Sequence, residues 1–542
     1  MPDEKKWTLM FYLASDNPLA PGVISQLKAI KAAGWHQQAN VIVQFDPYTE
    51  DTPTHVFDVN ISRKKSEPDK VSDIGFRAND SYVHNLIEDR LWRDETDRHG
   101  NLIRERLGRS QDYNHELLPN GGTGENGNHK EPSPQESLGK FLQFCADSYP
   151  ADHYMLFIMG HGVVVGNDVF LFDEHAEEQT LSLGGLRDVL NEFHKSKKKG
   201  ALELVSFHSC SVSSLEVAYE LRGMANYMLA SQAPTYIGSL PYRQILVRIF
   251  NSLEPNREEN TIESMLRDIC AYCFHNSKDF LLAGYPYDIC LSRLGEPVDQ
   301  SKAEIDKLAV ALDKGLGVAS FQDAILLAHL KAQSFQGEMY TDIADFCRCL
   351  YRQILRATAA TEEQDSIRTE IKAGCEKVIS AVRNNIVRSR LAGPEYQYAK
   401  GLSIYFPWTK PSDYLMGRYG EHEFVKPKEG SWLDFLDKYF SATMRKGVQD
   451  EALEPIAELG ERPVNKQPNP SDELWEDKVA LVYTQAAGQA SPYALDKPIK
   501  TDSTDPMGAC SCSSIKNYPR DTRRRKERKK ALDKFPASLS SE

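Results

Sequence analysis

A histidine and a cysteine each follow a run of strand-forming residues, and these residue types at these positions could do chemistry. Residues 153–159 lead into Gly160-His161-Gly162, and residues 202–208 lead into Ser209-Cys210. In an open parallel sheet, ligands and reacting groups gather at the carboxyl ends of the strands. If the two strands are neighbours, His161 and Cys210 lie side by side, which is the arrangement of a cysteine nucleophile with its base.

The residues around the pair fit this chemistry. The polar run Ser211–Ser214 opens a predicted helix, and a helix N-terminus stabilises a thiolate. The glycines that flank His161 allow a tight turn and a close approach of the backbone to a substrate. The backbone N–H groups of Gly162 and Cys210 are the predicted oxyanion donors. The structural alternative is that both side chains are simply buried, because free cysteine is among the most buried residue types.

The strands and helices that must position this pair are predicted to form an α/β fold. Residues 7–14 and 40–45 are continuous apolar runs, which is typical of strands buried on both faces. A helix to about residue 33 separates them, and residues 56–61 alternate as an edge strand does. Strand, helix and strand of these lengths predict a mostly parallel sheet flanked by helices.

The rest of the sequence predicts three regions. Further expected elements are helices at 137–148, 181–195 and 213–224, a strand at 226–232, a largely helical stretch at 254–385, a strand at 401–407 and a helix at 432–440. Residues 1–250 form the expected catalytic core, with an exposed insertion at about 64–134. Residues 251–447 form a helical part that the strand at 401–407 and the helix at 432–440 complete. Residues 448–542 are expected to be mostly flexible, acidic and Pro-rich at first and then basic.

Charge and composition narrow the function classes. The formal net charge of the 542 residues is −13, and the segment 516–534 carries +7, which leaves −20 on the remainder. An acidic body disfavours nucleic acid as a specific partner. No apolar run is long enough for a membrane span, and the sequence before Trp7 has no signal-peptide pattern. Ten cysteines in so long a chain are too sparse for a disulfide framework. We therefore expect a cytoplasmic protein.

Several segments in order resemble the clostripain-type cysteine peptidases, which are relatives of caspases, legumains, gingipains and separases. The resemblance covers almost all of residues 7–440. It lies in the strand at Trp7 with residues 14–17, and in residues 149–154, 160–162, 209–210, 215–221, 230–232, 241–242, 339–346 and 401–407.

The resemblance implies a caspase-haemoglobinase-like sheet and a cysteine endopeptidase. Cys210 would be the nucleophile, and His161 the base or the proton donor to the leaving amine. The expected substrate-binding residues are His208, Ser209, Ser231 and Gln232. The resemblance also implies that the substrates are proteins or peptides, and that the protein is a latent zymogen which an activating protease cuts within the chain. The expected chemistry requires no cofactor and no metal. Calcium is a possible addition that only the resemblance implies.

One residue departs from the family pattern. The family usually has an acidic residue two positions before its cysteine, which suits Arg or Lys before the scissile bond, and this chain has His208 there. An imidazole cannot pair with a guanidinium as a carboxylate does. The sequence thus predicts a latent intracellular cysteine endopeptidase, in a regulated or defence-linked pathway by analogy, and leaves its residue preference open. The alternative is a catalytically inactive scaffold of the same fold that binds a protein partner.

Overall fold

The computed structural model describes most of the region from residue 5 to residue 449. The described residues are 5–15, 19–45, 55–58, 92–96, 102–106, 133–162, 171, 180–196, 200–254, 261–276, 286–335 and 339–449. Most of the expected insertion at 64–134 and nearly all of the expected tail at 448–542 lie outside these residues. Predictions about those two segments therefore stay predictions.

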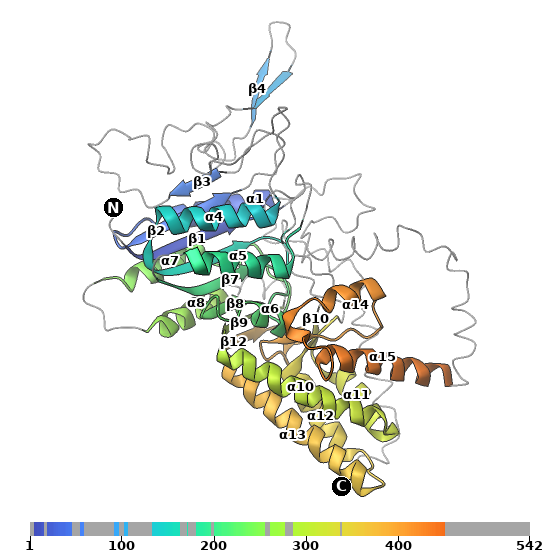
Figure 1. Ribbon diagram of the computed structural model, residues 1–542. Helices are drawn as coiled ribbons and strands as arrows, with labels where there is room; N and C mark the ends of the chain where they lie inside the picture. Colours follow the sequence, from blue (N-terminus) through green and yellow to red (C-terminus); the bar gives the residue numbers. More distant parts are fainter. Residues whose placement is uncertain are drawn as a thin grey trace.

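An eight-stranded sheet forms the centre of the molecule (Figure 1). Its strands, in spatial order, are β12 (Ile386–Ala392), β9 (Tyr287–Arg293), β8 (Tyr227–Ala230), β7 (Ala201–His208), β6 (Ala151–Met159), β1 (Lys5–Leu13), β2 (Ala39–Phe45) and β3 (His55–Asp58). The five strands from β8 to β2 run parallel, whereas β3, β9 and β12 pair antiparallel with their neighbours. This arrangement confirms the predicted mostly parallel α/β sheet.

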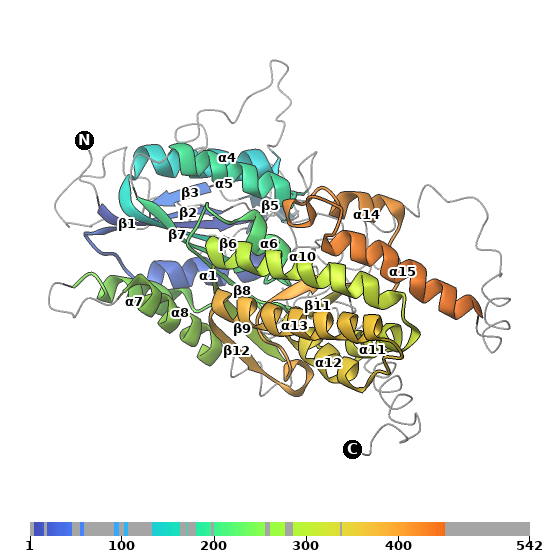
Figure 2. The same cartoon turned by 60° about the horizontal axis from the view of Figure 1, so that its bottom comes forward.

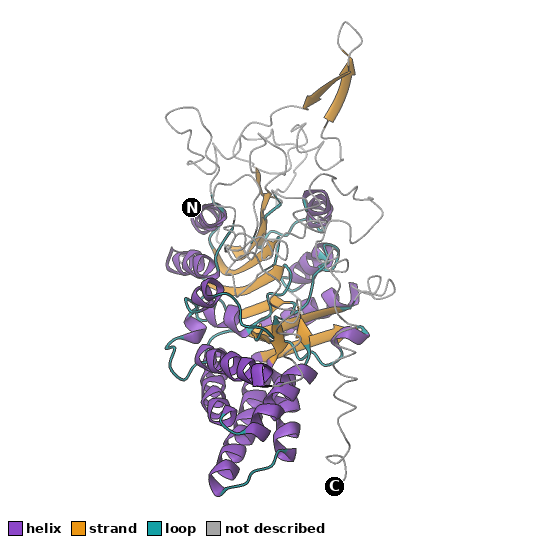
Figure 3. Cartoon of the chain, turned by 90° about the vertical axis from the view of Figure 1, so that its right-hand side faces the viewer, coloured by secondary structure: helices purple, strands orange, loops and turns teal. Residues whose placement is uncertain are grey.

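Helices cover both faces of the sheet, as Figures 2 and 3 show. One face packs against α4 (Pro134–Ser148), α5 (Leu183–Ser196) and α6 (Leu215–Glu220), and the other against α1 (Ala20–Ala32), α7 (Tyr242–Asn251) and α8 (Ile262–Asn276). Residues in the central strands alternate between these two cores, so Met10 faces the first and Phe11 the second. Burial on both faces is the reason that these strands are continuous apolar runs.

A mainly helical part follows β9 and lies beyond the β12 edge of the sheet (Figure 1). Its helices are α10 (Glu296–Leu316), α11 (Ala319–Lys331), α12 (Ile343–Arg356), α13 (Glu362–Asn385), α14 (Asp413–Tyr419) and α15 (Trp432–Gln449), with short 3-10 turns at Pro394–Tyr396 and Glu423–Val425.

The prediction of a largely helical stretch at 254–385 missed β9, because the apolar run of β9 is short and interrupted by Asp288. The division of the chain at residue 250 stays a prediction, although β9 and β12 complete the main sheet.

Two smaller sheets complete the described strands. A three-stranded sheet contains β10 (Ser334–Phe335), β11 (Tyr340–Asp342) and β13 (Ser403–Tyr405), and a hairpin contains β4 (Trp92–Thr96) and β5 (Leu102–Arg106). The expected strand at 401–407 is therefore present as β13, outside the main sheet. Ser214 forms a bridge with Ser403, so the three-stranded sheet contacts the chain just after Cys210.

Among the helices that the structure describes, none combines the length and the apolar character that crossing a bilayer requires.

Candidate active site

The strands that precede His161 and Cys210 are neighbours. β6 and β7 pair in parallel, with Met159 opposite His208. The N–H of Gly160 donates to the carbonyl of His208 at 3.4 Å, so the pairing continues past the end of both strands. His161 and Cys210 each lie two residues beyond the last pair. Both therefore follow the carboxyl ends of adjacent parallel strands, where sites in such sheets form.

The Gly-His-Gly turn packs directly against Cys210. A Cβ atom added to Gly162 would lie 2.1 Å from the carbonyl oxygen of Cys210 and 2.7 Å from its Cβ. No side chain fits in that space, so glycine is required for this close approach. The imidazole of His161 is fully buried, and Cys210 is 4% exposed. The structure thus brings the predicted base and nucleophile into one buried cluster.

The turn that carries Cys210 has an unusual backbone. Ser211, the next residue, has φ = 57°, which a non-glycine residue rarely adopts. Such a conformation costs about 1–3 kcal/mol and persists only where the surroundings enforce it. Here Ser211 donates its N–H to the carbonyl of Ala233 at 3.2 Å, and Thr235 Oγ1 donates to the carbonyl of Ser209 at 3.1 Å. The segment after β8 therefore supports the turn of the nucleophile.

The thiol of Cys210 faces the segment after β8. Its sulfur donates to the carbonyl of Thr235 at 3.8 Å. This contact involves the protonated thiol, whereas the thiolate is the nucleophile.

Burial sets the protonation state of His161. Removal of the ring from water lowers the pKa of His161 well below its usual value, so the imidazole is neutral at neutral pH. Neutral imidazole is the form that accepts a proton from a thiol. The expected support from a helix N-terminus is weaker than predicted, because α6 begins at Leu215 rather than Ser213 and is only six residues long. The helix dipole acts within about one turn, and Cys210 lies beyond it.

His208 is part of the core. Its Nε2 donates to the carbonyl of Tyr236 at 2.7 Å, so Nδ1 is the unprotonated nitrogen and accepts from the Tyr242 hydroxyl at 3.1 Å. Burial lowers the pKa of His208 to about 4. The side chain is therefore uncharged, and both of its nitrogens are used within the fold. Its expected role in substrate binding stays a prediction.

The other three expected substrate-binding residues are buried next to the Cys210 turn. Ser209 precedes Cys210, and the carbonyl of Ser231 accepts from the N–H of Ser213 at 2.9 Å. The side chains of Ser231 and Gln232 bond to two buried carboxylates, Ser231 to Asp288 at 2.7 Å and Gln232 to Asp342 at 3.0 Å.

Sequence reasoning missed Asp288, Asp342 and Thr235 as part of this arrangement. Asp288 interrupts an apolar strand run, and an acidic residue in such a run needs buried donors. That was the only signal for Asp288, and it lay in a stretch interpreted as helical. Thr235 carries no pattern of its own, because its partner Ser209 is distant in the sequence. Asp342 lies in the segment 339–346 that carries the family resemblance, but that segment implied no role for it.

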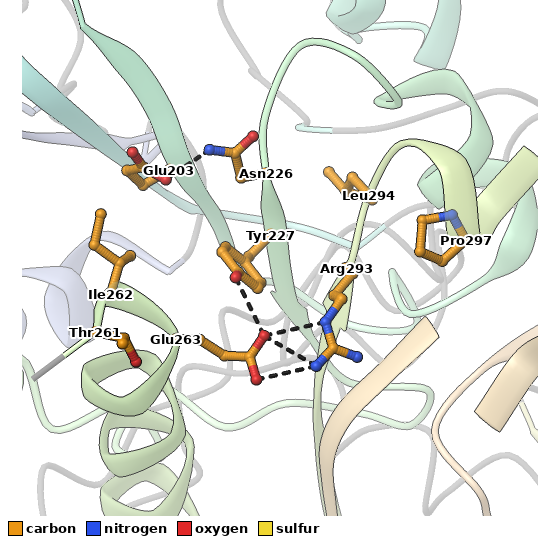
Figure 4. Close-up of a pocket in the computed structure, with 9 residues that line it drawn as sticks. All are labelled: Glu203, Asn226, Tyr227, Thr261, Ile262, Glu263, Arg293, Leu294 and Pro297. Atoms are coloured by element: carbon orange, nitrogen blue, oxygen red, sulfur yellow. Dashed lines mark hydrogen bonds and ion pairs between the residues drawn. The ribbon is translucent and has the colours of Figure 1, made fainter. Parts of the chain in front are cut away.

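Figure 4 shows a surface cavity of about 420 Å³ whose lining includes neither His161 nor Cys210. Its lining residues are Glu203, Asn226, Tyr227, Thr261, Ile262, Glu263, Arg293, Leu294 and Pro297. Glu203 and Tyr227 lie near the starts of β7 and β8, so the cavity is at the opposite edge from His161 and Cys210. Its charged groups bind one another, with Glu263 to Arg293 at 3.0 Å. We assign it no role in the chemistry.

In the described part of the chain, no group of three or more His, Cys, Asp or Glu side chains lies close enough together to hold a metal ion. Whether calcium or another cofactor takes part stays a prediction.

Comparison with known proteins places the chain in a family. A family model described as the Clostripain family matches residues 119–439. The chain is 24% identical over 388 residues to clostripain from Hathewaya histolytica, which covers 57% of this chain and 69% of that protein. Similar solved structures include a secreted C11 cysteine protease from Bacteroides thetaiotaomicron, with a TM-score of 0.46, 13% identity and coverage of 82% of this chain and 100% of that one. Another is an inactive zymogen C11 protease from Parabacteroides distasonis, with a TM-score of 0.41, 17% identity and coverage of 79% and 99%.

The family model spans more than half of the chain and includes both strand ends described above. The chain belongs to the clostripain family of cysteine peptidases. It is therefore a peptide-bond hydrolase of the cysteine type, and the resemblance inferred from the sequence is confirmed.

Proposed function

We propose that this peptidase is an endopeptidase in which Cys210 is the nucleophile and His161 transfers the proton. The observation that carries the proposal is the packing of Gly162 against Cys210 at the carboxyl ends of β6 and β7. This contact keeps the turn that carries His161 against the cysteine. The two residue types in this arrangement are those of a thiol peptidase.

The chemistry takes two steps. The thiol of Cys210 transfers its proton to neutral His161, and the thiolate attacks the carbonyl carbon of the scissile bond. The N–H groups of Gly162 and Cys210 would stabilise the oxyanion of the tetrahedral intermediate. The imidazolium then protonates the amine as the C–N bond breaks, which leaves a thioester on Cys210. In the second step His161 takes a proton from water, the hydroxide attacks the thioester, and the acid product and the free thiol are released.

Burial of the site supports the further proposal that the enzyme is latent in this form. The predicted base and nucleophile are both buried, with Cys210 only 4% exposed. A substrate needs access to Cys210. Activation would therefore require a rearrangement that exposes the site, and proteolytic cleavage is the event that the sequence predicts.

The remaining parts of the functional prediction are also proposals. Protein or peptide substrates follow from the peptidase class, and an activating protease from the proposed latency. Cytoplasmic localisation and a regulated or defence-linked pathway stay predictions, and the similar Bacteroides thetaiotaomicron protease is described as secreted. No cofactor is required by the two steps above.

A peptide-pool digestion tests the proposal. The reduced full chain, before and after limited proteolysis, is incubated with mixed peptides, and the products are identified by mass spectrometry. We expect internal cleavage by the wild type, loss of cleavage in Cys210→Ala, and cleavage by the control Cys349→Ala, which changes a thiol in α12. If all of these proteins fail to cleave, or if Cys210→Ala remains active, Cys210 is not the nucleophile of an endopeptidase. Failure of all of them would favour the inactive scaffold.

A further inference from the structure

We propose that Asp288 and Asp342 are positioning residues for Cys210. They are buried carboxylates that hold the two segments on which the Cys210 turn rests, and they act through backbone and side-chain donors rather than on the substrate. The inference rests on the proposed role of Cys210 as nucleophile. It adds two residues, from β9 and β11, to the machinery of the site.

Asp288 fixes the segment after β8. Its Oδ1 accepts from the Ser231 hydroxyl at 2.7 Å and from the N–H of Ala233 at 3.0 Å, while its Oδ2 accepts from the N–H of Gln232 at 2.9 Å. Both oxygens therefore receive donors, and two of these donors are backbone amides that cannot reverse their polarity. Only a carboxylate accepts on both edges, because an asparagine would present its NH₂ group to one of them.

The segment held by Asp288 in turn holds the Cys210 turn. Within it, the carbonyl of Ala233 accepts from Ser211, the carbonyl of Ser231 accepts from Ser213, and Thr235 donates to the carbonyl of Ser209. These three bonds bracket Cys210 on both sides in the sequence. They also enforce the positive φ of Ser211, which would otherwise relax.

Asp342 holds the same turn from the other side. Its Oδ2 accepts from the Gln232 side-chain amide at 3.0 Å and from the N–H of Lys400 at 2.6 Å. Gln232 Oε1 accepts from the N–H of Gly401 at 2.8 Å, and the carbonyl of Gly401 accepts from Ser213 Oγ at 2.6 Å. A continuous chain of bonds thus runs from Asp342 through Gln232 and Gly401 to Ser213.

The charges of these two residues distinguish them from ordinary buried scaffolding. In the described part of the structure neither carboxylate pairs with Lys or Arg, and their donors there are amides and a hydroxyl. Burial raises the pKa of each to about 6. A buried carboxylate without a cation is costly to maintain. Here each carboxylate accepts hydrogen bonds from several fixed donors at once, and these bonds offset the cost of burying its charge.

Kinetics of Asp288→Asn and Asp342→Asn test the proposal. We measure kcat per active site, with the sites titrated by a covalent thiol probe, together with KM, the rate of Cys210 alkylation and the thermal unfolding midpoint. The matched control is Glu203→Gln, because Glu203 is a buried carboxylate near the start of β7, at the opposite end of that strand from Cys210, and accepts from Asn226 at 2.6 Å. A misplacement of about 1 Å costs roughly 100-fold in rate, so we expect kcat to fall about 10- to 100-fold with KM within about threefold. The control should stay within about threefold of the wild type.

Exchange of the carboxylate at position 342 with the amide at position 232 should restore part of the lost activity. In the double variant Gln232→Glu with Asp342→Asn, the new amide can donate to the new carboxylate, which can still accept from Gly401. Only the bond from Lys400 is lost. We expect the double variant to recover at least about fivefold of the kcat lost in Asp342→Asn, because residues in one network are coupled. A double variant as slow as Asp342→Asn would overturn the role of Asp342 through Gln232.

The outcomes separate this inference from the proposed function. Unchanged kcat per titrated site in Asp288→Asn, with only a lower unfolding midpoint or fewer sites, would reduce Asp288 to a structural role and overturn the proposal. If the wild type shows no turnover but alkylation of Cys210 slows about tenfold in Asp288→Asn, the proposed function fails while the positioning stands. Should Asp288→Asn not fold, Ser231→Ala removes one of the three donors. It should lower kcat about threefold, and an unchanged kcat would overturn the proposal.

Discussion

The two glycines that flank His161 make opposite predictions when each is replaced by alanine. Gly162 faces the backbone of Cys210, where an added Cβ would lie 2.1 Å from the carbonyl oxygen. Gly160 faces the end of the Leu171 side chain, where the added Cβ would lie 2.7 Å from Cδ2, and then Ala14 Cβ at 3.2 Å. A side-chain terminus can rotate away, whereas a backbone carbonyl held by its neighbours cannot.

The size of the effect follows from these distances. Ordinary contact begins near 3.4 Å, so Gly162→Ala forces the two turns apart by about 1.3 Å. Displacement of a reacting group by about 1 Å costs roughly 100-fold in rate. Overpacking of this kind destabilises a protein by about 1–3 kcal/mol. We therefore expect Gly162→Ala to lower kcat about 100-fold while the protein stays folded, and Gly160→Ala to lower it by less than about fivefold.

The assay compares both variants with the wild type after reduction. Peptide cleavage is measured per titrated Cys210, and thermal unfolding shows whether each variant is folded. The alkylation rate of Cys210 gives a second readout that does not require turnover. A Gly162→Ala enzyme with kcat within threefold of the wild type would refute the reasoning. An equal loss in Gly160→Ala would also refute it, because a general demand for flexibility would then explain both.

Three further outcomes follow from the site. Because the reaction needs the thiolate of Cys210, alkylation with iodoacetamide should abolish peptide cleavage in proportion to the fraction of Cys210 that is modified; full activity of the alkylated protein would contradict this. Thr235→Val removes the bond to the Ser209 carbonyl and should lower kcat about 3- to 10-fold, at a stability cost of about 1 kcal/mol in urea unfolding, whereas unchanged kcat would exclude a role for this bond. The pKa of His208 falls from 6.5 to about 4 on folding, so the unfolded chain binds more protons between these values and stability is lost as pH falls through them. His208→Gln should therefore remove about 3 kcal/mol of the stability change between pH 7 and pH 4, and parallel unfolding curves for the variant and the wild type would show that His208 is not buried and neutral.

The parallel core of the fold could be predicted because its strands are buried on both faces. The runs at β1, β2, β6 and β7 are apolar throughout, and this pattern leaves little alternative to a central parallel strand. β9 and β12 could not be predicted in the same way. β9 contains Asp288, and β12 is a partly exposed edge strand rich in arginine, so neither has a continuous apolar run.

The reacting groups of the candidate site could be predicted from the sequence, whereas the residues that position them could not. His161 and Cys210 stand out because each follows a strong strand with a turn-forming residue nearby. Their proximity then follows from the pairing of β6 with β7. The roles of Asp288 and Asp342 depend on bonds that span 55 or more residues to the segment after β8. No local pattern encodes such a contact, so only the folded structure reveals it.

Identification of the cysteine that reacts first with a thiol-directed peptide probe would test the assignment of Cys210 most directly. The reduced protein and a His161→Ala variant are treated for short times, and the labelled cysteine is located by mass spectrometry. We predict that Cys210 is labelled ahead of the other nine cysteines in the wild type, and that the rate falls at least about 100-fold in His161→Ala. Labelling spread over several cysteines, or labelling of Cys210 that does not depend on His161, would contradict the account.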